Sequence, residues 1–422
     1  MKTIEELKQT LNQINWDFSD YNSSKYPLDI NSVPWYPATF PAPIPKFLIA
    51  LLSDVGDTVL DPFGGKGTTV VEAIKLNRRF VYNDLNPFAV CITDAIVRAI
   101  KSCSFERDAL ERISNSDKEI GSKLVRLCCK KNYSAESVME YCPEHLLDNL
   151  RELDINTDVI FWYHIDTLLE LYAIIKHMKA EEFIDNNAFL IRKLAFVSIL
   201  KETSSQRGHF TYVTDNCRPK NLVYYNAISA YLSMLERINL SSLDLLKQYL
   251  TTSENGDISE LIGKSIVHIG DARQLNWIDD DSIDFVLTSP PYLCAQDYVK
   301  TMRLTNLFFP DESFVKSVPN EIGSRSRRRS NAEIVVSNFY SDMETVFAEI
   351  ERVLKSKKYF CLIIGQGKGK ITKSYDTIGD LIKSITTKFE FSEVFRTNRR
   401  ISHKIVRIGG VDTETIVVFQ KK

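Results

Sequence analysis

The tetrapeptide Ser289-Pro290-Pro291-Tyr292 has the residue types needed to hold an amino group that is carried on a flat ring. It follows Ser282–Leu287, an apolar run that predicts a buried strand. The two prolines fix the backbone and leave carbonyl oxygens without competing N–H donors. The Ser289 hydroxyl and the Pro290 carbonyl could each accept one hydrogen of an amino group, and the Tyr292 ring could stack on its ring. A proline-rich turn or a peptide ligand for a partner protein is the alternative, which the position after a buried strand disfavours.

A glycine-rich turn, DPFGGKGTT at residues 61–69, lies between an expected strand, Thr58–Leu60, and an expected helix, Thr69–Leu76. Glycines there let the backbone approach a nucleotide-like cofactor where a Cβ atom would clash. The helix N-terminus offers free N–H groups to a carboxylate or phosphate. Lys66 precedes Gly67 rather than following it, so the spacing is not that of a phosphate-binding P-loop. By itself the segment fits a structural tight turn as well as a cofactor site.

Two aspartates follow other expected strands. Asp84 comes after the strand Arg79–Tyr82, where a carboxylate can accept hydrogen bonds from both hydroxyls of a ribose. Asp271 comes after the strand Ser265–Ile269 and could accept a hydrogen bond from an adenine amino group. A helix cap or a turn explains either residue alone. Together with the glycine-rich turn and the tetrapeptide, they predict one site at the strand ends.

The elements that would position these residues form an α/β sheet with a helical interruption. Strand patterns return after residue 262, and the last two, FEFSEVFRT and TETIVVFQKK, predict antiparallel strands around a basic loop. Residues 97–262 have apolar side chains at three- and four-residue spacing and almost no glycine, which predicts a helical insert. The proline-punctuated segment 35–45 is not expected inside a helix, and a helix is expected at Lys46–Leu52.

The composition is that of an ordinary soluble globular protein, with 44% hydrophobic and 26% charged residues in 422. The eight cysteines form no C-x-x-C pair, which favours reduced thiols over a zinc site or a disulfide framework. The same absence of paired cysteines favours a protein without a metal. We expect it in the cytoplasm, because the sequence shows no signal peptide and no membrane-spanning apolar run. The net charge is −2, so binding to nucleic acid must rest on local basic patches.

Together these residues resemble the amino-group DNA methyltransferases, which make N4-methylcytosine or N6-methyladenine. The resemblance implies a class I methyltransferase (Rossmann-like) sheet with an antiparallel C-terminal hairpin and a large helical insert. It implies Ser289, Pro290, Pro291 and Tyr292 as the catalytic residues. It implies S-adenosylmethionine as the cofactor, bound by Thr39, Phe40, Asp61, Phe63, Gly65, Gly67, Thr68, Asp84, Asp271 and Ala272.

The resemblance also suggests a division of the chain. Residues 1–34 would form an N-terminal helical segment, residues 35–96 and 263–422 the catalytic domain, and residues 97–262 a candidate target-recognition domain. The usual descriptions of the family put the target-recognition region elsewhere, not between the second and third cofactor-binding strands. DNA phosphates would be met by basic residues in three runs. These residues are Arg207, Arg218, Lys220, Arg325, Arg327, Arg328, Arg329, Arg399 and Arg400.

The expected reaction is site-specific methylation of a base that has been flipped out of DNA. Serine at the first position of the tetrapeptide favours cytosine N4, whereas aspartate or asparagine is the commoner form for adenine N6. An N6-adenine methyltransferase is therefore the main alternative. An RNA base methyltransferase and a catalytically silent DNA-binding subunit are weaker alternatives, because no appended RNA-binding domain is evident and the tetrapeptide is intact. DNA is the expected partner, and a restriction endonuclease for the same site could accompany the protein.

Overall fold

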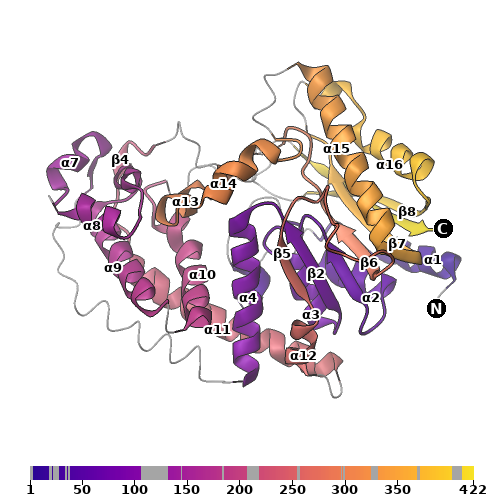
Figure 1. The fold of residues 1–422 in the computed structure, drawn as a ribbon, viewed down its shortest axis with the longest axis horizontal. Helices are drawn as coiled ribbons and strands as arrows, with labels where there is room; N and C mark the ends of the chain where they lie inside the picture. Colours follow the sequence, from indigo (N-terminus) through magenta and orange to yellow (C-terminus); the bar gives the residue numbers. More distant parts are fainter. Residues whose placement is uncertain are drawn as a thin grey trace.

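The chain has a mixed α/β fold, elongated in the view of Figure 1, with a sheet towards one end and a group of helices towards the other. The computed structural model describes residues 3–18, 21, 28–33, 36, 39–105, 132–143, 145–182, 185–206, 218–253, 257–295, 297, 300–324, 331–367, 371–401 and 411–422. Within these residues no helix is both long enough and apolar enough to cross a membrane.

The central sheet has seven strands in the order β5-β2-β1-β6-β7-β9-β8. Their bounds are β1 (Thr58–Asp61), β2 (Arg79–Asp84), β5 (Ile266–Ile269), β6 (Ile283–Thr288), β7 (Leu354–Gly365), β8 (Phe391–Arg400) and β9 (Thr413–Lys421). The first five strands in this order run parallel, and β9 pairs antiparallel with both β7 and β8. This arrangement confirms the expected mostly parallel sheet with an antiparallel C-terminal hairpin.

Both faces of the sheet are buried. Successive side chains of a strand point to opposite faces, and each face contributes to its own apolar core. On β6, Phe285 and Leu287 join one apolar core while Val286 joins the other. The first core is covered by α2 (Pro43–Leu52), α3 (Thr68–Lys75) and α4 (Pro87–Phe105). The second is covered by α15 (Ala332–Val353) and α16 (Thr377–Lys388), which lie together over the sheet in Figure 1.

The middle of the chain is largely helical, as its pattern predicted. It contains α7 (Val138–Tyr141), α8 (Leu146–Glu152), α9 (Ile165–Glu181), α10 (Asn186–Thr203), α11 (Ala227–Thr252) and α12 (Ile258–Gly263). A short antiparallel pair, β3 (Tyr133–Ser134) and β4 (Asn221–Leu222), joins its outer end. Two later helices, α13 (Arg303–Phe308) and α14 (Glu312–Ser317), follow the tetrapeptide, and α13 packs against α10 of the helical group.

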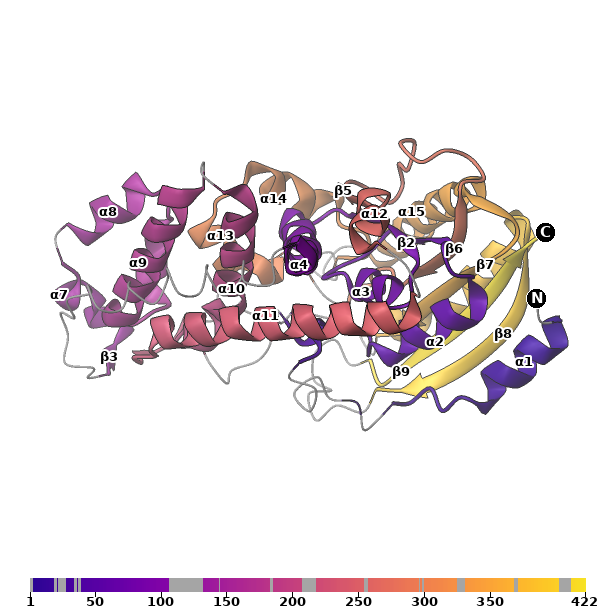
Figure 2. The same ribbon diagram turned by 90° about the horizontal axis from the view of Figure 1, so that it is seen from below.

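Two expected boundaries differ from the structure. The expected insert begins at residue 97, but that position lies inside α4, which continues without a break to Phe105. At the other end α11 extends from the outer helices to the sheet side and contacts α3 as well as α9 (Figure 2). The helix expected from Lys46 begins at Pro43, because prolines in a first helical turn lose no hydrogen bond.

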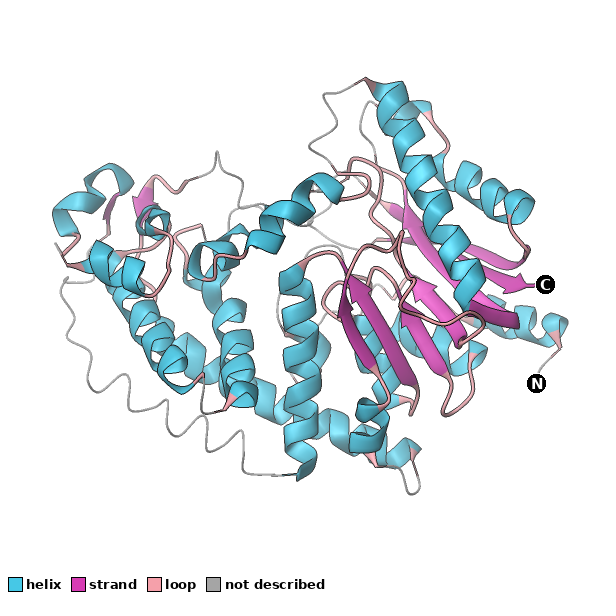
Figure 3. Cartoon of the chain, viewed as in Figure 1, coloured by secondary structure: helices cyan, strands magenta, loops and turns pink. Residues whose placement is uncertain are grey.

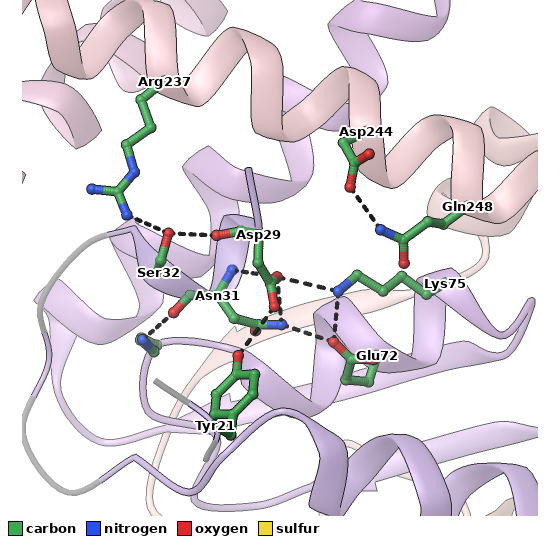
Figure 4. A network of polar contacts seen from close by, with 10 residues as sticks. Tyr21, Asp29, Asn31, Ser32, Glu72, Lys75, Arg237, Asp244 and Gln248 are labelled. Atoms are coloured by element: carbon green, nitrogen blue, oxygen red, sulfur yellow. Dashed lines mark hydrogen bonds and ion pairs between the residues drawn. The ribbon is translucent and has the colours of Figure 1, made fainter. Parts of the chain in front are cut away.

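A buried polar network fastens the N-terminal segment to the sheet side of the molecule (Figure 4). The Lys75 ammonium lies 2.8 Å from Glu72 Oε1 and 3.2 Å from Asp29 Oδ1. Asn31 donates to the same Glu72 oxygen at 2.8 Å. Ser32, in the short 3-10 helix Ile30–Ser32, also receives a hydrogen bond from Arg237 of α11. The segment that precedes the pocket is therefore held by α3 and α11 together.

Replacing Lys75 with methionine should destabilise the protein by about 3–5 kcal/mol, because it leaves the buried Glu72 carboxylate without its cation. The matched control is Lys8→Met, which removes an exposed ion pair with Glu5 in α1 (Ile4–Gln13) and should cost less than about 1 kcal/mol. Urea unfolding at pH 7 measures both changes. Equal losses in the two variants would show that the network does not stabilise the fold.

Candidate active site

The ends of four parallel strands surround a pocket at one edge of the sheet. Figure 3 shows the loops after β1, β2, β5 and β6 at the arrowhead edge, where parallel strands place their carboxyl ends. The space between these loops, including the solvent at its open mouth, has a volume of about 670 Å³. Its lining residues are Tyr36, Pro62, Phe63, Gly65, Asp84, Leu85, Asn86, Asp271, Ala272, Ser289, Pro291, Asn320, Glu321 and Ile322.

The Asp61 carboxylate lies behind the pocket wall and joins three segments. One oxygen accepts from the Thr288 hydroxyl at 2.8 Å and from the Phe63 N–H at 3.2 Å, and the other accepts from the Thr69 hydroxyl at 2.6 Å. The residue is only 3% exposed, and burial raises its pKa to about 6. Asp61 lies outside the pocket lining, and its carboxylate positions the glycine-rich turn and the end of β6.

The glycine-rich turn passes very close to buried side chains. A Cβ atom on Gly64 would lie 2.2 Å from the ring of Tyr82, which is fully buried in β2. Gly67 has a φ of +84° and caps α3, and a Cβ there would lie 2.8 Å from Thr93. Of the predicted residues in this turn, Phe63 and Gly65 line the pocket. Gly67 and Thr68 lie outside the lining, at the start of α3.

Asp84 lines the pocket and also holds the turn in place. One of its oxygens accepts from the Gly65 N–H and the other from the Asn86 N–H, each at 2.8 Å. Burial raises the pKa of Asp84 to about 6, although both N–H groups act in the opposite direction. The neighbouring Asn83 side chain donates to the carbonyls of Pro62 and Gly270, so it links the loops after β1 and β5.

Asp271 and Ala272 line the pocket, but the Asp271 carboxylate is already engaged. The Arg273 guanidinium donates to both of its oxygens, with Nε at 2.9 and 3.1 Å. The same guanidinium reaches Asp342 of α15 at 2.6 Å. An adenine amino group would therefore share the carboxylate with an arginine, which a sequence pattern gave no means to foresee.

The tetrapeptide contributes Ser289 and Pro291 to the pocket lining, while Pro290 and Tyr292 lie outside it. Ser289 Oγ lies 3.2 Å from the Tyr292 hydroxyl, which donates to Glu414 Oε1 at 2.8 Å. The Tyr292 ring is 8% exposed and packs against the backbone at Gly365, where a Cβ would lie 2.7 Å from it. In this arrangement one part of the ring is covered by the end of β7.

Seven pocket residues were absent from the sequence-based set. Pro62, Leu85 and Asn86 directly follow the ends of β1 and β2, so their positions in the chain could have indicated them. Tyr36 lies three residues before the predicted Thr39 and Phe40, which are themselves outside the lining. The last three, residues 320–322, are the end of the 3-10 helix Val318–Asn320 and the two residues after it, for which the sequence offered no signal.

The predicted DNA-binding residues fall into four groups. Arg218 is exposed but pairs with Asp158 at 3.2 Å and lies 4.3 Å over the Phe161 ring. Lys220 and Arg400 are exposed. A third group, Arg207, Arg325, Arg327, Arg328 and Arg329, lies outside the described residues, and Arg399 is the fourth.

The prediction for Arg399 was wrong. Its guanidinium is 4% exposed, forms an ion pair with Glu414, and donates to the Trp16 carbonyl at 3.1 Å. A cation in this position is committed to the protein interior and does not reach a phosphate. Among the described residues, no group of three or more His, Cys, Asp or Glu side chains is placed to hold a metal ion.

Comparison with known proteins shows that the chain is similar to methyltransferases. A DNA methylase family model matches residues 2–94. Type II methyltransferase M.MvaI from Kocuria varians is 22% identical over 87% of this chain and 83% of its own length. Type II methyltransferase M.BsoBI from Geobacillus stearothermophilus is 27% identical over 71% of this chain, which covers 57% of that relative. An rRNA methyltransferase structure from Streptomyces viridochromogenes aligns over 96% of both chains, but its 12% identity and TM-score of 0.34 support no argument.

The close approach of Gly64 to Tyr82 can be tested with one added methyl group. Gly64→Ala should destabilise the protein by about 1–3 kcal/mol, because the buried ring must shift or the turn must move. Gly263→Ala is the matched control: this residue ends α12, and a Cβ there would meet nothing within 4 Å. Thermal unfolding compares the two variants. If Gly64→Ala is as stable as the control, the turn is not packed as described.

Proposed function

We propose that this chain, which belongs to the amino-group DNA methyltransferase family, transfers a methyl group from S-adenosylmethionine to an exocyclic amino group of a base in DNA. The observation that carries the proposal is the position of Ser289, which opens onto the same pocket as Gly65, Asp84 and Asp271. A group that can accept hydrogen bonds from an amino nitrogen thus lies beside the residues suited to a nucleoside cofactor.

The pocket residues fit S-adenosylmethionine in chemistry. Asp84 presents a carboxylate at the wall for ribose hydroxyls, and Gly65 brings backbone without a side chain to the same wall, where a Cβ would lie 3.4 Å from the Tyr36 ring. Phe63 and Ile322 supply apolar surface for a flat base. When bound, the cofactor would supply a methyl group on a sulfonium, from which a neutral thioether is a good leaving group.

The protein's own contribution is to hold the amino group in place. The lone pair of an exocyclic amine is delocalised into the base, which makes the amine a poor nucleophile. Hydrogen bonds from its two N–H groups to Ser289 Oγ and the Pro290 carbonyl would localise that lone pair toward the methyl carbon. Positioning and oriented acceptors then lower the barrier, and neither a metal nor a covalent intermediate is needed.

We propose cytosine N4 as the target, because serine holds the first position of the tetrapeptide. Adenine N6 is the alternative within the same mechanism. An amino group in duplex DNA is buried in the base stack, so the base must be flipped toward Ser289. For Tyr292 to support that base, its ring must become accessible beyond the 8% seen here.

The helical part of the chain is the proposed target-recognition region. It presents the exposed Arg218 and Lys220 directly before β4. Both relatives named above are described as type II methyltransferases, which supports DNA as the substrate and a restriction endonuclease as a possible companion. We propose that the protein acts in the cytoplasm, where DNA and S-adenosylmethionine are both present.

The identity of the product tests the proposed function. DNA incubated with the protein and labelled S-adenosylmethionine should yield N4-methylcytosine on digestion and mass spectrometry. Ser289→Ala should lower turnover by about 10²-fold or more, since an acceptor beside the reacting atom is lost. The exposed Ser392 of β8 provides the matched control, and Ser392→Ala should leave turnover unchanged.

Each other product has a distinct meaning. N6-methyladenine would correct the base while keeping the mechanism, whereas 5-methylcytosine would contradict the mechanism. Methyl transfer to tRNA but not to DNA would replace the proposed substrate. An absence of transfer to either would favour the silent-subunit alternative.

The raised pKa of Asp84 predicts how cofactor binding depends on pH. Below a pKa of about 6 the carboxyl is protonated, so it accepts hydrogen bonds poorly and does not balance the cofactor's positive charge. Affinity should therefore rise about tenfold from pH 5 to pH 7.5, because protonation weakens binding about tenfold per pH unit below the pKa. Calorimetry with S-adenosylmethionine measures this, and Asp84→Asn should flatten the profile. A flat profile in the unaltered protein would contradict the role of Asp84.

A further inference from the structure

A chain of buried polar groups leads away from the pocket into the C-terminal hairpin. Ser289 Oγ lies 3.2 Å from the Tyr292 hydroxyl, and that hydroxyl donates to Glu414 Oε1 of β9 at 2.8 Å. The other Glu414 oxygen pairs with Arg399 of β8, whose Nε donates to the Trp16 carbonyl. Tyr292, Glu414 and Arg399 are all less than a tenth exposed.

The chemistry of these groups fixes the direction of the hydrogen bonds. A tyrosine hydroxyl has one hydrogen, and here that hydrogen goes to the Glu414 carboxylate, which can only accept. The contact between Ser289 and Tyr292 therefore requires the serine to donate its own hydrogen. The remaining lone pairs of Ser289 Oγ are then available to accept from a group in the pocket.

Methylation of an amine leaves one proton to be removed. The nitrogen lone pair forms the new N–C bond while the donor's S–C bond breaks and leaves its electron pair on sulfur. The nitrogen then carries a positive charge, which it loses when one N–H bond breaks. The proton therefore needs an acceptor within hydrogen-bond reach of the nitrogen.

We propose that Glu414 is that acceptor and that Ser289 and Tyr292 relay the proton to it, an inference that rests on the proposed function. The amino proton passes to Ser289 Oγ, the serine proton to the Tyr292 oxygen, and the tyrosine proton to the Glu414 carboxylate. Each hydroxyl gains one proton and loses one, so both end neutral, and only Glu414 is newly protonated. The next turnover requires Glu414 to release this proton to solvent.

Arg399 is a positioning residue in this scheme. Its guanidinium pairs with the Glu414 oxygen that does not face Tyr292, and its bond to Trp16 holds it between the hairpin and the N-terminal segment. The carboxylate is thereby kept in line with the tyrosine hydroxyl. The buried ion pair also supplies the positive charge that a carboxylate needs at this depth.

Kinetics of three variants test the relay. Glu414→Gln keeps the shape of the side chain and can still accept from Tyr292, but it cannot take up the proton. It should lower kcat about 10²-fold while the affinity for S-adenosylmethionine, measured by calorimetry, stays unchanged. Tyr292→Phe should lower kcat at least as much, and the double variant should be no slower than Tyr292→Phe alone, because both changes interrupt one path.

Glu393→Gln provides the matched control. Glu393 lies on the neighbouring strand β8, where it pairs with Arg396 at the surface, so its replacement should leave kcat unchanged. Multiplicative losses in the double variant, or full activity of Glu414→Gln, would contradict the relay.

A second measurement does not depend on activity. Protein labelled with ¹³C at the tyrosine ζ carbon should show a Tyr292 resonance, assigned with Tyr292→Phe, that moves in Glu414→Gln and stays in place in Glu393→Gln. If the chemical shift of Tyr292 is the same in Glu414→Gln as in the unaltered protein, the hydrogen bond is absent and the relay is overturned. If the unaltered protein transfers no methyl group while the resonance moves as expected, the proposed function fails and the relay, which rests on it, falls with it. An active protein with a fully active Glu414→Gln variant rejects the relay alone.

Discussion

The hydrogen bonds of one buried carboxylate, that of Asp61, hold the site together. Through Thr69 and Thr288 it joins the end of β1 to the start of α3 and to the end of β6. These hydrogen bonds satisfy a charge that burial otherwise disfavours, which is why its pKa rises only to about 6. The glycine-rich turn and Ser289 emerge from the segments that this carboxylate connects. The buried Asp61 carboxylate thus sets the distance between the glycine-rich turn and the tetrapeptide.

Above this floor the pocket is assembled from loops that also bond to one another. The Asp84 carboxylate receives N–H groups from the glycine-rich turn and from its own loop, and Asn83 connects the loops after β1 and β5. The Asp84 oxygens at the pocket wall therefore already fix the turn, and a ribose proposed to bind there would share them. Carboxylates can serve in this way because each oxygen has two lone pairs.

The sequence was sufficient to predict the sheet and the positions of most strand ends, because these follow from local apolar runs and from turn residues. It was insufficient wherever a partner comes from a distant part of the chain. In the sequence Arg399 is one member of a basic run. In the structure it is buried, pairs with Glu414 and donates to the Trp16 carbonyl. Asp61 reads as a cofactor ligand because it opens the turn, yet it faces Thr288, more than two hundred residues away. Glu321 likewise lines the pocket only because of tertiary packing, which the spacing of apolar residues in the sequence does not indicate.

The 26-residue helix α11 has a consequence for how such enzymes could exchange specificity. At about 1.5 Å per residue it forms a rod of about 39 Å that belongs at one end to the outer helices and at the other to the sheet. Arg237, midway along it, is bonded to the N-terminal segment at Ser32. A recombination event that swaps the helical region between relatives would have to cut this rod or carry it whole, together with its contacts to α3. Substitutions within the helical region therefore disturb fewer contacts with the sheet than the transplantation of the whole region would.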